Sequence, residues 1–214
     1  MLIIGAKGFA KEVLEVCRQN NDLKNLTFFD NVNKDIPEKL YERFKILKSD
    51  SEVQFFFKEV TSHFTIGIGN PLLRRKMYDK FINLGGIIKS TISPKAVIGN
   101  YGNELGAGVN IMSNVVMTSD IKIGKGVLIN LACTIGHDTI IGEFSELSPC
   151  VNVSGNCVIG NNCFIGTGAI ILPGVKIGNN TIVGAGAVVT KDLPENCTAL
   201  GVPARVVGGG DLDN

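Results

Sequence analysis

Residues 123–170, written in sixes, read IGKGVL INLACT IGHDTI IGEFSE LSPCVN VSGNCV IGNNCF IGTGAI. The first letter of every six is aliphatic, and this phase holds without a slip from Leu105 to Val188, which is 14 sixes. The second letter is glycine in eight of them, and the fifth is always small or β-branched. Two earlier units start at Ile92 and Ile98, the second stretched by one residue. Such a fixed period indicates a repeat architecture.

A period of six fits neither an α-helix at 3.6 residues nor a simple amphipathic strand at 2. It fits short strands and turns wound as a coil, with the first residue pointing into the core and the fifth packed beside it. We expect glycine at the second position to let the chain turn with positive φ where needed. One six cannot bury its apolar face alone, so the coils must stack. The repeat therefore predicts a parallel β-helix.

The first 88 residues follow a different pattern, in which strands alternate with helices. Apolar runs predict strands at residues 2–4, 26–29 and 64–69. A helix is expected from Phe9, and Asn70-Pro71 is expected to cap and open another helix through Phe81. This order predicts a small parallel α/β domain, and such sheets bind ligands at the carboxyl ends of their strands. The glycine-rich turn at 5–8 alone is a weak sign of nucleotide binding.

Composition narrows the class of protein. The chain has 214 residues, 44% of them hydrophobic, and a formal net charge of +1, so nucleic acid and anionic membranes are disfavoured as partners. No apolar stretch approaches the ~20 residues of a membrane span. The N-terminus lacks the features of a signal peptide, which favours a cytoplasmic protein. The six cysteines show no zinc-finger spacing and are expected to be reduced and structural.

One histidine in the repeat stands out as a chemical candidate. The chain has only two histidines, and His63, before a predicted strand, is expected on the surface. Ile135 points inward, so His137, two residues later, lies at or near a coil corner and faces outward. Asp138 is the nearest carboxylate that could fix its tautomer and raise its basicity. Taken alone, the pair fits a general base and an ordinary exposed histidine equally well.

Two further features of the repeat suggest binding surfaces. The corners around Thr167 and Ala185 are 18 residues apart and rich in Gly and Ala, which leaves their amides exposed. Asn130, one six before Gly136, is a candidate for orienting a substrate or intermediate.

The repeat, and the tail Gly201-Val202-Pro203-Ala204-Arg205, resemble the hexapeptide-repeat acyltransferases, whose coil is left-handed with three sixes per turn. The resemblance implies that residues 18 apart stack, which places His137 between Ser119 and Gly155 and makes a smooth groove for a coenzyme along Thr167 and Ala185. The α/β domain placed before the repeat resembles one group in particular, the bacterial sugar-nucleotide N-acetyltransferases of the PglD/NeuD-like family. The resemblance covers essentially the whole chain. It implies a Rossmann-like domain at 1–88 that holds the nucleotide sugar, and a left-handed β-helix acyltransferase domain at 89–214. It also implies a homotrimer.

The resemblance implies a role for each candidate residue. The catalytic base would be His137 with Asp138. The substrate would be bound by Lys7, Gly8 and Phe9 at the pyrophosphate, by Asp30, Asn31 and Gly69 at the nucleoside, and by Asn130 at the sugar; acetyl-CoA would be bound by Glu146, Thr167 and Ala185. Some members of this family carry histidine at the position of Phe9, and members often carry histidine at the position of Glu146, near the acetyl thioester, so these two contacts differ here.

The function implied is acetyl-CoA-dependent N-acetylation of a nucleotide-linked amino sugar, with UDP as the expected carrier, for bacterial glycan, capsule or O-antigen synthesis. The main alternative is O-acetylation of a sugar or sialic acid, because the same base serves a hydroxyl. A non-catalytic scaffold is a weaker alternative. The γ-class carbonic anhydrases share the helix but need three zinc-binding histidines, whereas this repeat has one. No metal is expected.

Overall fold

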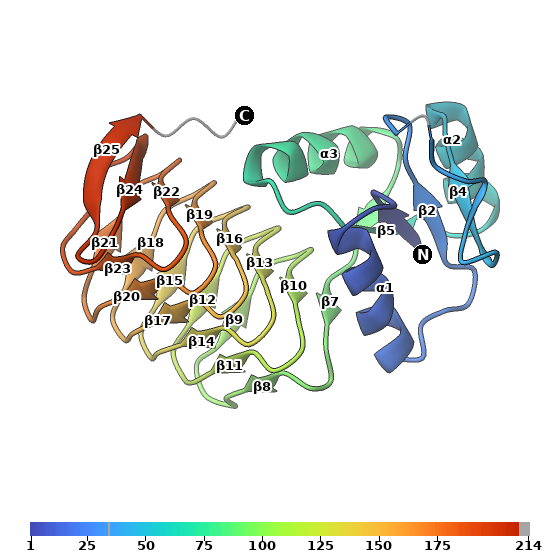
Figure 1. Cartoon of the computed structure of the whole chain (residues 1–214). Coiled ribbons are helices and arrows are strands. Elements are labelled where there is room, and N and C mark those ends of the chain that lie inside the picture. Colours follow the sequence, from blue (N-terminus) through green and yellow to red (C-terminus); the bar gives the residue numbers. More distant parts are fainter. Residues whose placement is uncertain (34, 210–214) are drawn as a thin grey trace.

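The computed structural model describes residues 1–33 and 35–209, and its N-terminal part is an α/β layer (Figure 1). Six strands form one sheet in the order β3-β4-β2-β1-β5-β6, parallel except for β3 against β4. The strands are β1 (Leu2–Ile4), β2 (Thr27–Phe29), β3 (Lys39–Leu40), β4 (Phe44–Leu47), β5 (His63–Ile66) and β6 (Ile87–Ile88). The helices are α1 (Phe9–Gln19), α2 (Asp50–Glu59) and α3 (Pro71–Asn83).

The strands and helices expected from the sequence are present, whereas α2, β3, β4 and β6 were not anticipated. Asn70 caps α3, as its side chain accepts a hydrogen bond from the backbone N–H of Leu73 at 2.9 Å. A capping box at Ser49 and Glu52 starts α2. That spacing of serine and glutamate is a readable helix signal. None of the helices in the described residues is long and apolar enough to cross a membrane.

The rest of the chain is a coil of mostly two-residue strands in three sheets (Figure 1). From β10 to β23, paired residues are 18 apart, so each turn of the coil takes three sixes. The first face holds β7 (Thr91–Ile92), β10 (Asn110–Ile111), β13 (Leu128–Ile129), β16 (Glu146–Leu147), β19 (Phe164–Ile165), β22 (Ile182–Val183), β24 (Cys197–Leu200) and β25 (Arg205–Gly209), the last antiparallel.

The second face holds β8 (Val97–Ile98), β11 (Val116–Met117), β14 (Thr134–Ile135), β17 (Asn152–Val153), β20 (Ile170–Ile171) and β23 (Val188–Val189). The third face holds β9 (Glu104–Leu105), β12 (Lys122–Ile123), β15 (Ile140–Ile141), β18 (Val158–Ile159) and β21 (Lys176–Ile177). The division of the chain at residues 88 and 89 stays a prediction; β6 is the last strand of the first sheet, and β7 begins the coil.

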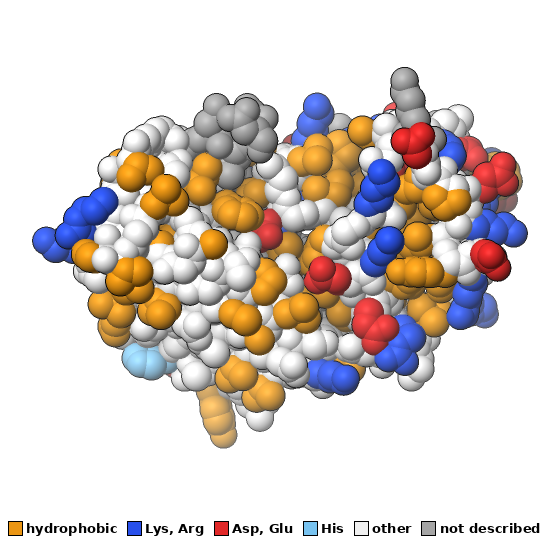
Figure 2. All heavy atoms as spheres, viewed as in Figure 1, with side chains coloured by type: hydrophobic (Ala, Val, Ile, Leu, Met, Phe, Trp, Pro, Cys, Tyr) orange, Lys and Arg blue, Asp and Glu red, His pale blue; other side chains and the backbone are white. Residues whose placement is uncertain are grey.

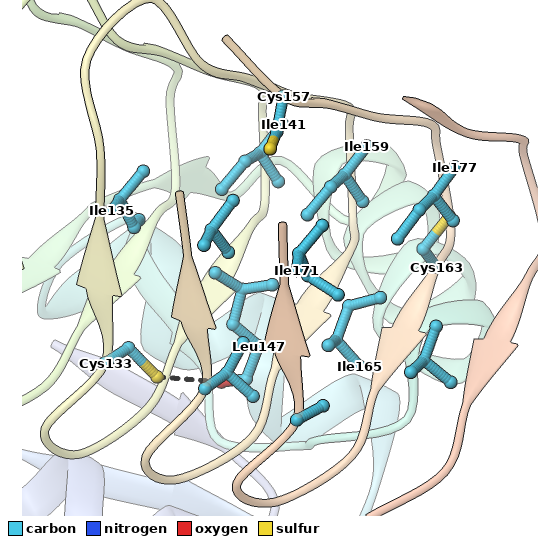
Figure 3. Packing of buried hydrophobic residues seen from close by; sticks show 14 of the residues in the cluster. Cys133, Ile135, Ile141, Leu147, Cys157, Ile159, Cys163, Ile165, Ile171 and Ile177 are labelled. Atoms are coloured by element: carbon cyan, nitrogen blue, oxygen red, sulfur yellow. Dashed lines mark hydrogen bonds between the residues drawn. The ribbon is translucent and has the colours of Figure 1, made fainter. Parts of the chain in front are cut away.

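The core of the coil is built as the repeat predicts. First-position residues form stacked rows inside the prism, and the fifth-position side chains fill the space beside them (Figure 3). Leu105 departs from this pattern with 37% of its surface exposed, because β9 is the edge strand of its sheet and pairs with a neighbour on one side only. The cysteines are free thiols, and Cys133 donates to the carbonyl of Ser148 at 3.1 Å. Burial raises the pKa of the Cys133 thiol to about 12.

The expected role of the second-position glycines is wrong. Positive φ falls on the fourth residue of all 14 sixes, where nine of the residues are not glycine. The second-position glycines are instead needed for close stacking. A Cβ on Gly124 would lie 2.7 Å from the backbone nitrogen of Glu143, which belongs to the next coil. Glycine is therefore selected here by the spacing between coils, and the turn is made two residues later.

Replacing Gly124 by alanine is expected to lower the free energy of unfolding by about 2 kcal/mol, because rigid backbone atoms would have to move. Gly208→Ala is the matched control, since a Cβ there meets nothing within 4 Å. Urea unfolding followed by circular dichroism measures both. Equal midpoints for the two variants would contradict the stacking explanation.

The α/β layer lies against the first face of the coil, beside which Figure 1 shows α1 and α3. Val16 of α1 packs on Met112 and Leu128. A buried polar cluster joins the two parts: Asn110 donates to the carbonyl of Ile66 at 2.7 Å and accepts from the Thr91 hydroxyl at 2.7 Å. These buried polar groups satisfy one another only in one relative position, so they fix how the strand ends of the α/β layer meet the coil.

Candidate active site

His137 and Asp138 form a hydrogen-bonded pair at the corner between β14 and β15, here called the second corner. Nδ1 of His137 lies 2.8 Å from Oδ2 of Asp138, and the two side chains are 58% and 55% exposed. A carboxylate only accepts, so the pair leaves Nε2 as the free, basic nitrogen. A Cβ on Gly155 would lie 2.7 Å from Nε2, so glycine makes the room for the ring. The outward placement predicted for His137 is confirmed.

The backbone conformation at residue 138 also favours an aspartate. It is the fourth residue of its six and has a φ of 56°. Aspartate tolerates the left-handed region better than most residues do. The turn that this conformation makes places the carboxylate beside the imidazole.

Asn130, Thr167 and Ala185 lie at a different corner, between the first and second faces, here called the first corner. Asn130 follows β13 and is buried, and its side-chain oxygen accepts from the N–H of Leu131 at 2.7 Å. Thr167 and Ala185 are exposed one coil apart, as expected. The turns beside them are open, since nothing lies within 4 Å of a Cβ on Gly168 or Gly186. This column of small residues suits a long, thin ligand.

The first and second corners are the two edges of the second face. A single chain therefore does not bring His137 to Asn130, Thr167 and Ala185, because one side of the triangular coil separates them. The sequence could have revealed that Asn130 and His137 lie at different corners, since they belong to consecutive sixes and each six makes one corner.

The α/β layer brings the ends of β1 and β5 together, as predicted. Gly5 follows β1, and a Cβ there would lie 2.9 Å from the carbonyl oxygen of Gly67. Gly8 has a φ of 39° and is open, and Lys7 beside it is exposed. Phe9, which begins α1, is half-buried and packs toward the coil.

Asp30 and Asn31 follow β2 at the same edge. Asn31 is exposed, but Asp30 is buried and its carboxylate is turned to its own loop. Oδ1 accepts from the N–H groups of Val32 and Asn33, and Oδ2 accepts from the side-chain amide of Asn33. Asp30 thus shapes the loop, and Asn31 is the exposed member of the pair.

Glu146 lies in a different setting from Thr167 and Ala185, with which the sequence resemblance had grouped it. It projects from β16 on the first face and is buried beneath Gly69, whose Cβ would lie 3.1 Å from Oε2 of Glu146. The Ser148 hydroxyl donates to Oε1 at 3.4 Å, whereas Oε2 has no hydrogen-bond partner among the described residues. Burial raises the pKa of the Glu146 carboxyl to about 7.

Arg74 on α3 is a buried cation that sequence reasoning missed, and it is 1% exposed. Its guanidinium donates to the carbonyls of Phe144 and Ser145, at 3.0 and 2.9 Å, and to Gly69 at 3.4 Å. Burial lowers its pKa to about 10. Arg74 thereby ties the Gly69 loop to the coil that carries Glu146. In an otherwise ordinary surface helix, no pattern distinguishes such a residue in advance.

No group of three or more His, Cys, Asp and Glu residues in residues 1–33 and 35–209 could hold a metal ion.

Two family models match the chain: the PglD N-terminal domain over residues 1–81, and the bacterial transferase hexapeptide, of six repeats, over residues 156–191. A serine acetyltransferase from Synechococcus elongatus is 30% identical over 107 residues, which is 45% of this chain and 44% of that protein. The match therefore spans less than half of that relative.

Solved structures match the chain over nearly its whole length. A mutant form of perosamine N-acetyltransferase from Caulobacter crescentus, in complex with CoA and GDP-perosamine, is 32% identical, with 97% of this chain and 96% of that chain covered and a TM-score of 0.89. WeeI from Acinetobacter baumannii AYE is 31% identical over 96% and 98% of the two chains, with a TM-score of 0.87.

The acetyltransferase domain of PglB from Neisseria gonorrhoeae FA1090, in complex with acetyl coenzyme A, is 27% identical over 96% and 98% of the two chains, with a TM-score of 0.86. The coil of this chain is the left-handed β-helix of such acetyltransferases. The chain therefore belongs to the PglD/NeuD-like family of hexapeptide-repeat sugar N-acetyltransferases.

Proposed function

We propose that this protein transfers the acetyl group of acetyl-CoA to the amino group of a UDP-linked amino sugar, for bacterial glycan, capsule or O-antigen synthesis. The observation that carries the proposal is the outward His137–Asp138 pair, with Nδ1 held at 2.8 Å and Nε2 free. The relative that binds CoA and GDP-perosamine supports a nucleotide-linked amino sugar as the acceptor class. UDP as the carrier and the cytoplasm as the location stay predictions.

In this mechanism His137 removes a proton from the amine as it attacks the acetyl carbonyl, and Asp138 holds the imidazole in the tautomer that can do so. The thioester is already activated, so the attack of the neutral amine needs one positioned base, which contributes about 10²–10⁴-fold. The nucleotide lies at the strand ends near Lys7, Gly8 and Phe9, with Asn31 and Gly69 beside it. The groove at Thr167 and Ala185 holds the coenzyme, and Asn130 orients the sugar.

The separation of the His137–Asp138 pair at the second corner from Asn130 and Thr167 at the first corner supports a homotrimer. The outward side chains of the second face include Val97, Val116 and Ile170, each at least 39% exposed. Figure 2 shows charged side chains gathered over the α/β layer, while the coil presents mainly uncharged atoms on the side in view. If three copies turn their second faces toward one axis, the second corner of each meets the first corner of the next. Each site then combines His137 of one copy with Asn130 and Thr167 of another.

A panel assay tests the proposed reaction. Release of thiol from acetyl-CoA is measured with UDP-, GDP- and dTDP-linked amino sugars, and with sialic acid and hydroxyl sugars as rivals. Release only with amino sugars is expected. Release with hydroxyl acceptors alone would replace the proposal by O-acetylation, and no release with any acceptor would favour a non-catalytic scaffold.

Asp138→Asn is expected to lower kcat by about 10²-fold with little change in KM, because an amide can present its N–H to Nδ1 and so favour the wrong tautomer. The matched control is Asp120→Asn, which changes the fourth residue of the corresponding six one coil earlier and should keep the parent kcat. Steady-state kinetics on the best acceptor of the panel measures both. An unchanged kcat in Asp138→Asn would remove the carboxylate from the mechanism.

A further inference from the structure

We infer that Glu146 selects an amine over a hydroxyl acceptor: its carboxylate receives the ammonium group of the sugar and takes up one proton before the acetyl transfer. This inference rests on the proposed function and deepens it. It assigns to Glu146 a place at the acceptor, whereas the sequence resemblance had grouped it with the coenzyme groove.

Glu146 lies between the two regions that suit the two halves of the reaction. The carboxylate lies under Gly69, which follows β5 at the strand ends of the α/β layer. Ser148, which donates to it, stacks between Asn130 and Gly166 in the column of the first corner. Glu146 thus stands between the strand ends that suit a nucleotide and the groove that suits the coenzyme. The sugar of a nucleotide-linked acceptor has to occupy this interval.

The Glu146 carboxylate is buried with one oxygen unsatisfied. The residue is 7% exposed, and Oε2 has no hydrogen-bond partner among the described residues. A buried acceptor without a donor is costly, so a donor supplied by a ligand would be bound tightly. An ammonium group offers three donors and a positive charge, whereas a hydroxyl offers one donor and no charge.

The charged groups around Glu146 leave its carboxylate without an ion-pair partner. The charge of Arg74 on α3 lowers the pKa of Glu146, but the hydrogen bonds of Arg74 go to backbone carbonyls, its Nε has no hydrogen-bond partner, and among the described residues it forms no ion pair with Glu146. Glu12 on α1 adds a second negative charge that acts on Glu146, and burial raises the pKa of Glu12 too. The strand partners on either side, Leu128 and Phe164, are uncharged.

The protons balance in the proposed step. Glu146 as carboxylate takes one proton from the ammonium, which leaves a neutral amine with a free electron pair. The amine nitrogen forms a bond to the acetyl carbon, His137 takes the second proton, and the carbon–sulfur bond breaks. The thiolate takes the proton from His137 and leaves as the thiol. Glu146 releases its proton to solvent when the product departs. A carboxyl with a pKa of about 7 can accept and release a proton at neutral pH.

The first test is binding without acetyl-CoA, measured by calorimetry at about pH 7.5, which is above the pKa of about 7 of the Glu146 carboxyl, so that the carboxylate form predominates. The probes are a UDP-4-amino sugar and the matching UDP-4-hydroxy sugar. Glu146→Gln is expected to weaken binding of the amino sugar about 10- to 100-fold, the range of one charge-assisted hydrogen bond, and to leave the hydroxy sugar unchanged. The control Glu104→Gln changes an exposed glutamate at the same position of the repeat on the third face and should alter neither.

The second test is the pH profile of kcat/KM for the amino sugar that the parent enzyme acetylates. The deficit of Glu146→Gln should shrink as the pH passes the pKa of the sugar amine, because the amine then arrives already neutral. A merely structural role would lower the rate equally at every pH. Equal weakening for both probes, or a deficit independent of pH, would overturn the inference. If the parent enzyme acetylates no amino sugar, the proposed function itself has failed, and this outcome is distinguishable from an unaffected Glu146→Gln.

Discussion

Replacing His137 by alanine is expected to lower turnover by about 10²-fold or more while the protein stays folded. The variant loses the general base, and no other described histidine is near enough to replace it, because His63 lies at the start of β5, in the α/β layer. The His137 side chain is 58% exposed and its ring packs over a glycine, so its removal leaves no cavity in the core. The measurement is kcat with saturating acetyl-CoA, together with a thermal unfolding curve.

His63→Ala is the control for this variant, because its side chain is exposed and its ring bonds to Thr61, far from the second corner. It should keep the parent rate. If His137→Ala turns over at the parent rate, the base lies elsewhere. A fall in unfolding temperature that matches the loss of activity would instead make the effect structural.

Replacing Ile135 by aspartate is expected to prevent folding. Ile135 is 1% exposed and stacks in the coil between Met117 and Val153. A carboxylate there would have no partner, and burying it unpaired costs at least several kcal/mol. That is a large part of the ~5–15 kcal/mol by which a typical protein is stable. Far-ultraviolet circular dichroism and size-exclusion chromatography of the purified variant check the result.

Ile140→Asp makes the same chemical change on the next strand, where the side chain points outward and is 44% exposed. It should fold, because water solvates the new carboxylate. A cooperative unfolding transition of Ile135→Asp at the parent temperature would show that the first position of the six is not the core position.

The coil itself was determined by the sequence. A period of six in first-position residues such as Ile135 and Ile141 requires that the coils stack, because each coil must bury its apolar row against the next. The same counting put His137 at a corner, facing outward beside Asp138. These features depend on residues that are neighbours in the sequence or 18 apart, so they can be predicted from the amino-acid sequence.

The glycines of the repeat show where such counting goes wrong. Their fixed position was visible, but its cause was not, since the distance between backbones of adjacent coils appears only in three dimensions. The role assumed for glycine at the turn falls instead to the fourth residue, and aspartate, asparagine and other residues fill it as well.

Only the tertiary structure decided the surroundings of Glu146 and Arg74. Glu146 occupies an outward position of the repeat that is exposed in Glu104, and it is buried because the α/β layer docks on the first face. Arg74 is hidden by the same contact. The burial of a charged side chain depends on which surface meets it, and that surface here comes from residues 70 positions away or more. Periodicity fixes which way a side chain points, whereas docking fixes what it meets.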